Sequence, residues 1–243
     1  MNIGKRPFWL ELFLMILVPV VGMALGVGIT ITFSLNQTDY SNLIVNLFLF
    51  AAGILLVRIF KLSREDLGLK LIEGQLKRHA ILSLTVFTLY VLFYIFVIRI
   101  SALKAFSAST LWGLLTYLIV VVAEELYFRG ALYRFFEKRF SGRTAFIVTS
   151  LLFGLFHARQ GLSAILSRST TGFLWGSIRY STRMIFLIIF PIHFMYNATW
   201  LLFEGNWNNP PVWAIYTLPF IEFVLGLVIV FLQNNKQPQT KDN

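Results

Sequence analysis

The sequence contains no cysteine and only three histidines, His79, His157 and His193. The absence of cysteine excludes disulfides, cysteine-ligated zinc and a cysteine nucleophile. None of the histidines is followed by glutamate, so the chain has no His-Glu-x-x-His metalloprotease helix. The three aspartates lie in polar stretches, which argues against an intramembrane aspartyl pair, and no Gly-x-Ser-x-Gly elbow is present. Several classes of hydrolase are therefore excluded at the outset.

Charged residues are also scarce, at 13% of the 243 residues against about 25% in a typical soluble domain. Apolar residues make up 57%, and phenylalanine alone contributes 25 residues. A soluble domain of this size could not bury that much apolar surface, so the composition indicates a membrane protein. The formal net charge of +10 then indicates basic cytoplasmic loops rather than a nucleic-acid partner.

Long apolar runs predict the fold class. A membrane-spanning helix needs about 20 mostly apolar residues. Such runs occur at 8–34, 43–60, 80–98, 109–133, 144–159, 164–179, 184–203 and 212–232. The sequence therefore predicts an all-α polytopic membrane protein with about eight transmembrane helices. We expect one transmembrane domain over residues 1–233, with the motifs in 120–200, and a polar cytoplasmic tail at 234–243.

The basic residues predict the orientation. If the N-terminus is cytoplasmic, the outside segments contain only Arg99, Lys104, Arg159 and Arg168, and Arg129 lies within a span. That leaves 16 of the 21 Lys and Arg residues on the inside. Because basic residues concentrate in cytoplasmic loops, both termini are predicted to be inside, which requires an even number of spans.

Two adjacent glutamates stand in the fourth predicted span, in the segment VVAEELYFRGALY at 121–133. Glu125 and Arg129 are four residues apart, so they share a helix face and can form an ion pair. Glu124 points about 100° away around the helix and is free to face a cavity. One carboxylate is then neutralised while the other is available for acid–base work. The simpler alternative is an arginine held by two glutamates that only ties helices together.

Three more polar side chains lie in the following spans. His157 ends the apolar segment FGLFH, where a lone histidine is more often a structural core residue than a catalyst. His193 and Asn197 are four residues apart in HFMYN, so they share a face. At 1.5 Å per residue, Glu124 and His193 lie about 15 Å from the cytoplasmic ends of their helices, and His157 and Asn197 about 21 Å. The similar depths allow all four side chains to share one site.

Other polar residues are scattered within or beside the predicted spans, and we assign them no chemistry. They are Glu11, Asn46, His79, Arg168, Glu204 and Glu222.

The three motifs together resemble the CPBP family, which comprises type II CAAX-prenyl-protease-like membrane proteins and bacteriocin-processing or immunity proteins. The family pattern is Glu-Glu-x-x-x-Arg, then Phe-x-x-x-His, then His-x-x-x-Asn. Here it is formed by Glu124-Glu125 with Arg129, Phe153 with His157, and His193 with Asn197. The resemblance implies an intramembrane endopeptidase of the bacterial cell membrane, with a site opening toward the cytoplasmic half.

By this resemblance, Glu124 would be the general base that activates water, assisted by His157. His193 and Asn197 would stabilise the oxyanion, and Glu125 with Arg129 would support the site. The family is often labelled metalloprotease, and Glu124, His157 and His193 could form a zinc site. We favour no metal, because a carboxylate-activated water does not need one.

The expected partners are the lipid bilayer and a peptide or membrane-protein substrate, and nothing in the sequence indicates an oligomeric state. The alternative is a non-catalytic immunity or regulatory protein that binds a peptide or a membrane partner. A proton-coupled transporter is a third hypothesis, since buried Glu, Arg and His also form proton relays. It is the weakest of the three, because no paired broken helices or repeats are present.

Overall fold

The chain folds into a helical bundle in the computed structural model, which describes residues 3–35, 39–207 and 211–234. Its helices are α1 (Phe8–Thr32), α2 (Asp39–Phe60), α3 (Leu76–Phe93), α4 (Ala108–Glu125), α5 (Tyr133–Arg139), α6 (Gly142–Phe156), α7 (Leu162–Thr182), α8 (Phe194–Leu202) and α9 (Val212–Asn234). The π-helical stretches are η1 (Tyr94–Ile98), η2 (Leu126–Leu132) and η4 (Ile188–His193), and η3 (Ala158–Gln160) is a 3₁₀ turn. Within these ranges, strand-like pairing is limited to one bridge between Leu103 and Phe203. The all-α class is therefore confirmed.

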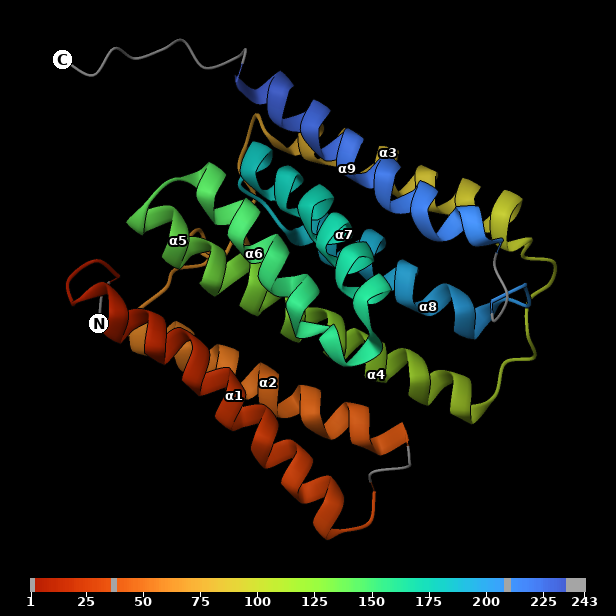
Figure 1. The fold of residues 1–243 in the computed structure, drawn as a ribbon, viewed down its shortest axis with the longest axis horizontal. Helices are drawn as coiled ribbons and strands as arrows, with labels where there is room; N and C mark the ends of the chain where they lie inside the picture. Colours follow the sequence, from red (N-terminus) through yellow and green to blue (C-terminus); the bar gives the residue numbers. More distant parts are fainter. Residues whose placement is uncertain (1–2, 36–38, 208–210, 235–243) are drawn as a thin grey trace.

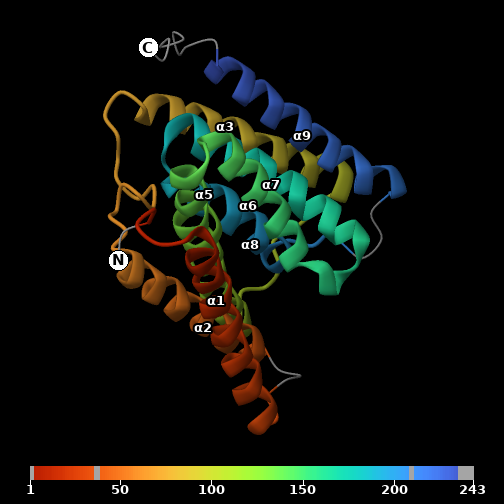
Figure 2. The same cartoon turned by 60° about the vertical axis from the view of Figure 1, so that its left-hand side comes forward.

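Helix α7 lies at the centre of the bundle (Figure 1). It packs against α6 and α9, while α1 pairs with α2, and α2 packs against α4. Helices α1 and α2 form one flank and project beyond the other helices, and α3 and α9 lie on the opposite flank (Figures 1 and 2). The first turn of α1 and the last turn of α9 lie at the same end of the bundle (Figure 1).

Five of the eight predicted spans coincide with helices that are long and apolar enough to cross a membrane. These helical segments are Phe8–Thr32, Tyr40–Phe60, Leu76–Ile98, Ala108–Arg139 and Val212–Gln233. The fourth is longer than the predicted 109–133, because η2 and α5 continue α4 without a break. The predicted tail at 234–243 falls outside the described residues, apart from Asn234 at the end of α9.

The remaining three predicted spans are 144–159, 164–179 and 184–203. Each lacks either the length or the hydropathy that a membrane-crossing helix needs. The first corresponds to α6, which has only 15 residues. The last is divided, because Pro191 interrupts regular helical bonding within η4 and α8 has only nine residues. The middle one corresponds to α7, which is long but polar and is buried along most of its second half. A helix surrounded by other helices needs no continuous apolar surface, so hydropathy does not identify it.

The outward faces of the long helices are apolar. Large exposed side chains include Phe13 on α1, Leu84 on α3, and Phe220 and Phe231 on α9. A soluble monomer rarely exposes an apolar surface on this scale. Together with the five long apolar helices, these faces identify an integral membrane protein.

Local sequence signals set the beginnings of the two helices that enter the site. Ser107 precedes α4 and its hydroxyl accepts a hydrogen bond from the backbone N–H of Thr110, with the reciprocal bond completing a capping box. Ser141 precedes α6 and accepts from the N–H of Thr144 in the same way. These caps fix where each helix starts, and so the turn at which its polar residue appears.

Candidate active site

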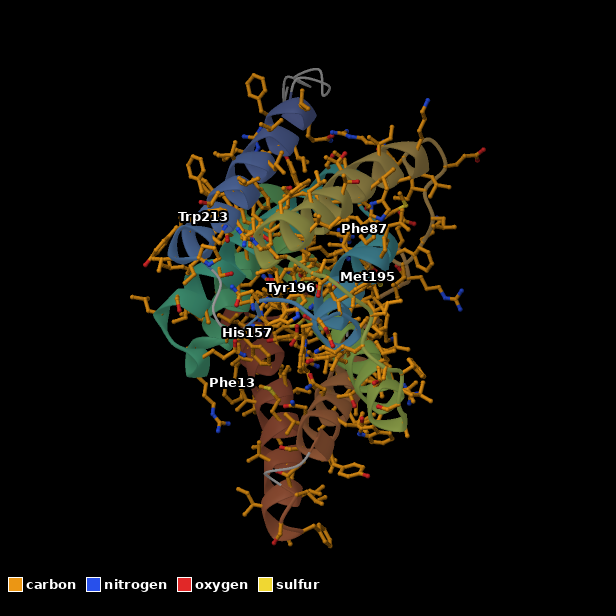
Figure 3. The ribbon with its side chains drawn as sticks, turned by 90° about the vertical axis from the view of Figure 1, so that its right-hand side faces the viewer. Phe13, Phe87, His157, Met195, Tyr196 and Trp213 are labelled. Carbon is orange, nitrogen blue, oxygen red and sulfur yellow. The ribbon has the colours of Figure 1, made fainter. Side chains whose placement is uncertain are left out.

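A cavity of about 1020 Å³ lies among α4, α6, α7 and α8. All four predicted catalytic residues line it, namely Glu124, His157, His193 and Asn197. Figure 3 faces the end of the bundle toward which the cavity extends, and it shows His157 and Tyr196 near the middle of the view. The helices thus bring the three sequence motifs to one place.

Glu124 is the residue on which the histidines converge. It lies in the last turn of α4 and is 6% exposed. Its Oε1 is 4.0 Å from Nε2 of His157, and its Oε2 is 3.7 Å from Nε2 of His193. Both distances exceed those of direct hydrogen bonds, so a single water molecule between carboxylate and imidazole would satisfy both groups.

The other ring nitrogen of each histidine determines which nitrogen carries the proton. Nδ1 of His157 is 2.8 Å from the carbonyl oxygen of Phe153, which can only accept a hydrogen bond. Nδ1 of His193 is 2.9 Å from Oε1 of Glu125, which accepts when ionised. Each Nδ1 therefore carries a proton, and in the neutral imidazole each Nε2 is an acceptor that faces Glu124.

The predicted ion pair between Glu125 and Arg129 is confirmed. Nη1 of Arg129 is 2.9 Å from Oε1 of Glu125, and both side chains are buried. Arg129 lies in the π-helical stretch η2, and its guanidinium stacks over Phe153 at 4.2 Å. Oε1 of Glu125 therefore holds both Arg129 and His193, and the pair anchors one histidine of the site as well as neutralising charge.

The donor atoms around the cavity are those that a zinc ion would require. Within residues 3–35, 39–207 and 211–234, no group of three His, Asp or Glu side chains has the spacing of a metal site. The predicted alternative ligand set is thus assembled around one cavity, but it does not fit a metal in this arrangement.

The cavity extends away from the end of the bundle where α1 begins and α9 ends. Its lining includes Asn42 near the start of α2, Ser109 near the start of α4, and Arg159 just after α6. These residues lie at the end of the bundle with few basic residues. The cavity therefore extends toward the end with few basic residues, and the expected opening toward the cytoplasmic half stays a prediction.

A buried arginine of α7 links the loop after α2 to η2. Arg179 is 3% exposed. Its Nε donates to the carbonyl of Arg129 at 3.3 Å, and its Nη2 donates to the carbonyl of Asp66 at 2.9 Å. The guanidinium thereby ties the loop after α2 to η2.

Several residues near the site carried no signal in the sequence. Trp175 of α7 is fully buried, and its ring lies 4.4 Å from the ring of His193. Arg168 of α7 lines the cavity and lies over the ring of Tyr196 at 5.4 Å. Only the order in which the helices pack brings these side chains to the motifs, so no local pattern could have indicated them.

Residues 106–199 match the model of a family described as type II CAAX prenyl endopeptidase, Rce1-like. The matched segment runs from the turn before α4 into α8 and contains every residue of the three motifs. The match confirms the family resemblance that the motifs predicted, and that family is one of membrane proteases. None of the curated proteins matches the chain.

Proposed function

We propose that this protein is an intramembrane endopeptidase that hydrolyses peptide bonds with a water molecule activated by Glu124. One observation carries the proposal: two histidine Nε2 atoms lie within 4.0 Å of the buried Glu124 carboxylate, in a cavity that Asn197 also lines. A base, a place for water and nearby donors are the groups that amide hydrolysis requires.

The first step is the attack of water on the substrate carbonyl. Glu124 takes a proton from the water as its oxygen bonds to the carbonyl carbon. Nε2 of His157, held as an acceptor by the bond of its Nδ1 to Phe153, accepts the water's other hydrogen bond and orients it. The product of this step is a tetrahedral intermediate with a negatively charged oxygen.

Two groups are available for that oxyanion. The carboxamide NH₂ of Asn197 donates without any change of protonation. His193 donates through Nε2 only as an imidazolium, because its Nδ1 proton is directed at Glu125. Glu125 is placed to stabilise that imidazolium. Collapse of the intermediate breaks the carbon–nitrogen bond, and the proton held by Glu124 passes to the leaving amine.

The family description implies a CAAX prenyl peptide as substrate, and we include peptides and membrane proteins more generally. We propose that the cell membrane is bacterial and that both termini are cytoplasmic, with most basic residues inside. We propose a mechanism without a metal, because a carboxylate-activated water does not need one. Metal analysis of the purified protein, with turnover measured with and without a chelator, tests this: loss of turnover that zinc restores would contradict it.

The decisive experiment is the Glu124→Gln variant, which keeps the size of the side chain but removes the base. Two probes are used with protein in detergent micelles: a peptide ending in a prenylated Cys-aliphatic-aliphatic-X sequence, and a library of unmodified peptides. We expect kcat to fall about 10²–10⁴-fold with little change in KM. Undiminished turnover refutes the proposal.

Glu204→Gln is the matched control, because Glu204 is exposed and does not line the cavity. It should cleave both probes at the wild-type rate. The second candidate function, an immunity or regulatory protein that binds a partner, is favoured if wild-type protein cleaves neither probe and Glu124→Gln retains the cellular phenotype.

A further inference from the structure

Helix α9 contains one charged residue, Glu222, in its 23 residues. The side chain of Glu222 is fully buried. A carboxylate inside a membrane bundle is costly and is usually paired with specific partners. Glu222 lies outside the segment matched by the family model, residues 106–199, so the resemblance gives it no role.

Polar groups from two other helices surround this carboxylate. The hydroxyl of Tyr90, on α3, donates to Oε1 of Glu222 at 2.6 Å. The hydroxyl of Thr171, on α7, lies 3.0 and 2.9 Å from the two carboxylate oxygens, and that of Thr170 lies 3.1 Å from Oε2. Glu222 therefore fixes the position of the Tyr90 hydroxyl from α9.

The chain of hydrogen bonds continues from Tyr90 toward the active site. Nε1 of Trp175 donates to the hydroxyl oxygen of Tyr90 at 3.0 Å, and both residues are buried. The ring of Trp175 then lies against the imidazole of His193, with centroids 4.4 Å apart and an interplanar angle of 44°. The chain of hydrogen bonds from Glu222 thus ends at Trp175, whose ring contacts a residue of the proposed oxyanion site.

The imidazole of His193 is held in two ways. Glu125 fixes one edge through Nδ1, and Trp175 covers one face of the ring. Rotation of the ring about the bond to Glu125 would carry Nε2 away from Glu124, and the indole opposes that rotation. Tyr90 also packs edge-on against Tyr196, the residue before Asn197, at 5.0 Å.

We infer that Glu222 and Tyr90 are positioning residues for His193, acting through the indole of Trp175. An indole N–H donates a hydrogen bond but has no lone pair with which to accept one, so the chain orients the imidazole and does not conduct protons to it. The expected change in turnover rests on the proposed function, whereas the expected change in the orientation of the His193 imidazole does not.

The first test observes the imidazole directly. The chain has only three histidines, so ¹⁵N NMR of histidine-labelled protein in micelles resolves each ring, with assignment by single replacement. In Tyr90→Phe and Glu222→Leu the signals of His193 should shift while those of His79 stay unchanged. Tyr127→Phe is the matched control, since it also removes one buried hydroxyl, which donates to the carbonyl of Met15.

The second test is kinetic and uses the prenylated peptide probe. Tyr90→Phe and Glu222→Leu should lower kcat about 10–100-fold, the cost expected for a slightly misplaced catalytic group, with KM almost unchanged. Glu222→Gln should retain most of the turnover, because its carboxamide oxygen still accepts from Tyr90.

Three results would overturn the inference: unmoved His193 signals in folded Tyr90→Phe and Glu222→Leu, equal shifts in Tyr127→Phe, or a Glu222→Gln variant as impaired as Glu222→Leu. The last result would assign the role to the charge itself. If wild-type protein cleaves no probe, the proposed function fails, and the NMR measurement still decides the positioning role of Glu222.

Discussion

Replacing Gly154 with alanine tests the closest helix contact in the site. A Cβ at Gly154, on α6, would lie 1.9 Å from Oγ of Ser169 and 2.5 Å from the backbone oxygen of Ile165, both on α7. The hydroxyl of Ser169 can rotate away, but the carbonyl of Ile165 cannot. The two helices must therefore separate, and His157, three residues further along, moves with α6.

The expected cost follows from these distances. Adding a methyl group to a packed interface typically costs about 1–3 kcal/mol, and the rigid carbonyl places Gly154→Ala toward the upper end. For a chain of this size, each kcal/mol lowers the melting temperature by roughly 2–4 °C. Removing the hydroxyl in Gly154→Ala/Ser169→Ala should restore only part of the loss, because the contact with Ile165 persists.

The assay is thermal unfolding in detergent, followed by circular dichroism, together with cleavage of the prenylated peptide. Gly28→Ala is the control, since a Cβ at Gly28 on α1 meets nothing within 4 Å. That variant should be neutral or gain about 0.4–1 kcal/mol. If Gly154→Ala is as stable as Gly28→Ala, or if the double variant is fully restored, the reasoning about the helix contact is wrong.

Two further predictions concern the loops. Burial would raise the pKa of Asp66, but the hydrogen bonds from the N–H and hydroxyl of Ser63 and from Arg134 outweigh it and lower the pKa. The stability contributed by ionised Asp66 is therefore present above its unfolded pKa of about 3.9 and is lost as pH falls through the lower folded value. Asp66→Asn should lose stability less steeply below about pH 4 in acid unfolding, and an identical slope would refute this. The predicted orientation is tested with single cysteines at the exposed residues Arg64 and Ser101, because the chain contains no other cysteine. When intact cells are treated with a membrane-impermeant thiol reagent, only the Ser101→Cys variant should be labelled.

The sequence predicted which motif residues lie together better than it predicted which helices are long and apolar enough to cross a membrane. Helical spacing was enough to place Glu125 beside Arg129, and the similar depths of Glu124, His157 and His193 correctly indicated one shared cavity. This worked because a membrane-embedded carboxylate or imidazole needs a partner, so few arrangements of the motifs were possible.

The remaining features depend on which helices become neighbours. Tyr90 and Glu222 are 132 residues apart in the chain, and neither periodicity nor hydropathy relates them. The sequence predicted a membrane-spanning helix at 164–179, but α7 there is polar and enclosed by other helices, so hydropathy is a poor guide to its place. The link that Arg179 makes between η2 and the loop after α2 also joins segments that are distant in sequence.

The π-helical stretch η2, between α4 and α5, makes this part of the chain sensitive to its residue count. A π turn contains about one residue more than an α turn. Deleting one residue there would allow the helix to close into a regular α-helix, and α5 beyond it would keep nearly the same orientation because the π turn already takes up the extra residue. A deletion between Glu125 and Arg129 would change their spacing from four residues to three, while α5 would still face α6. Such a deletion would thus change which residues meet in the site without breaking the helix.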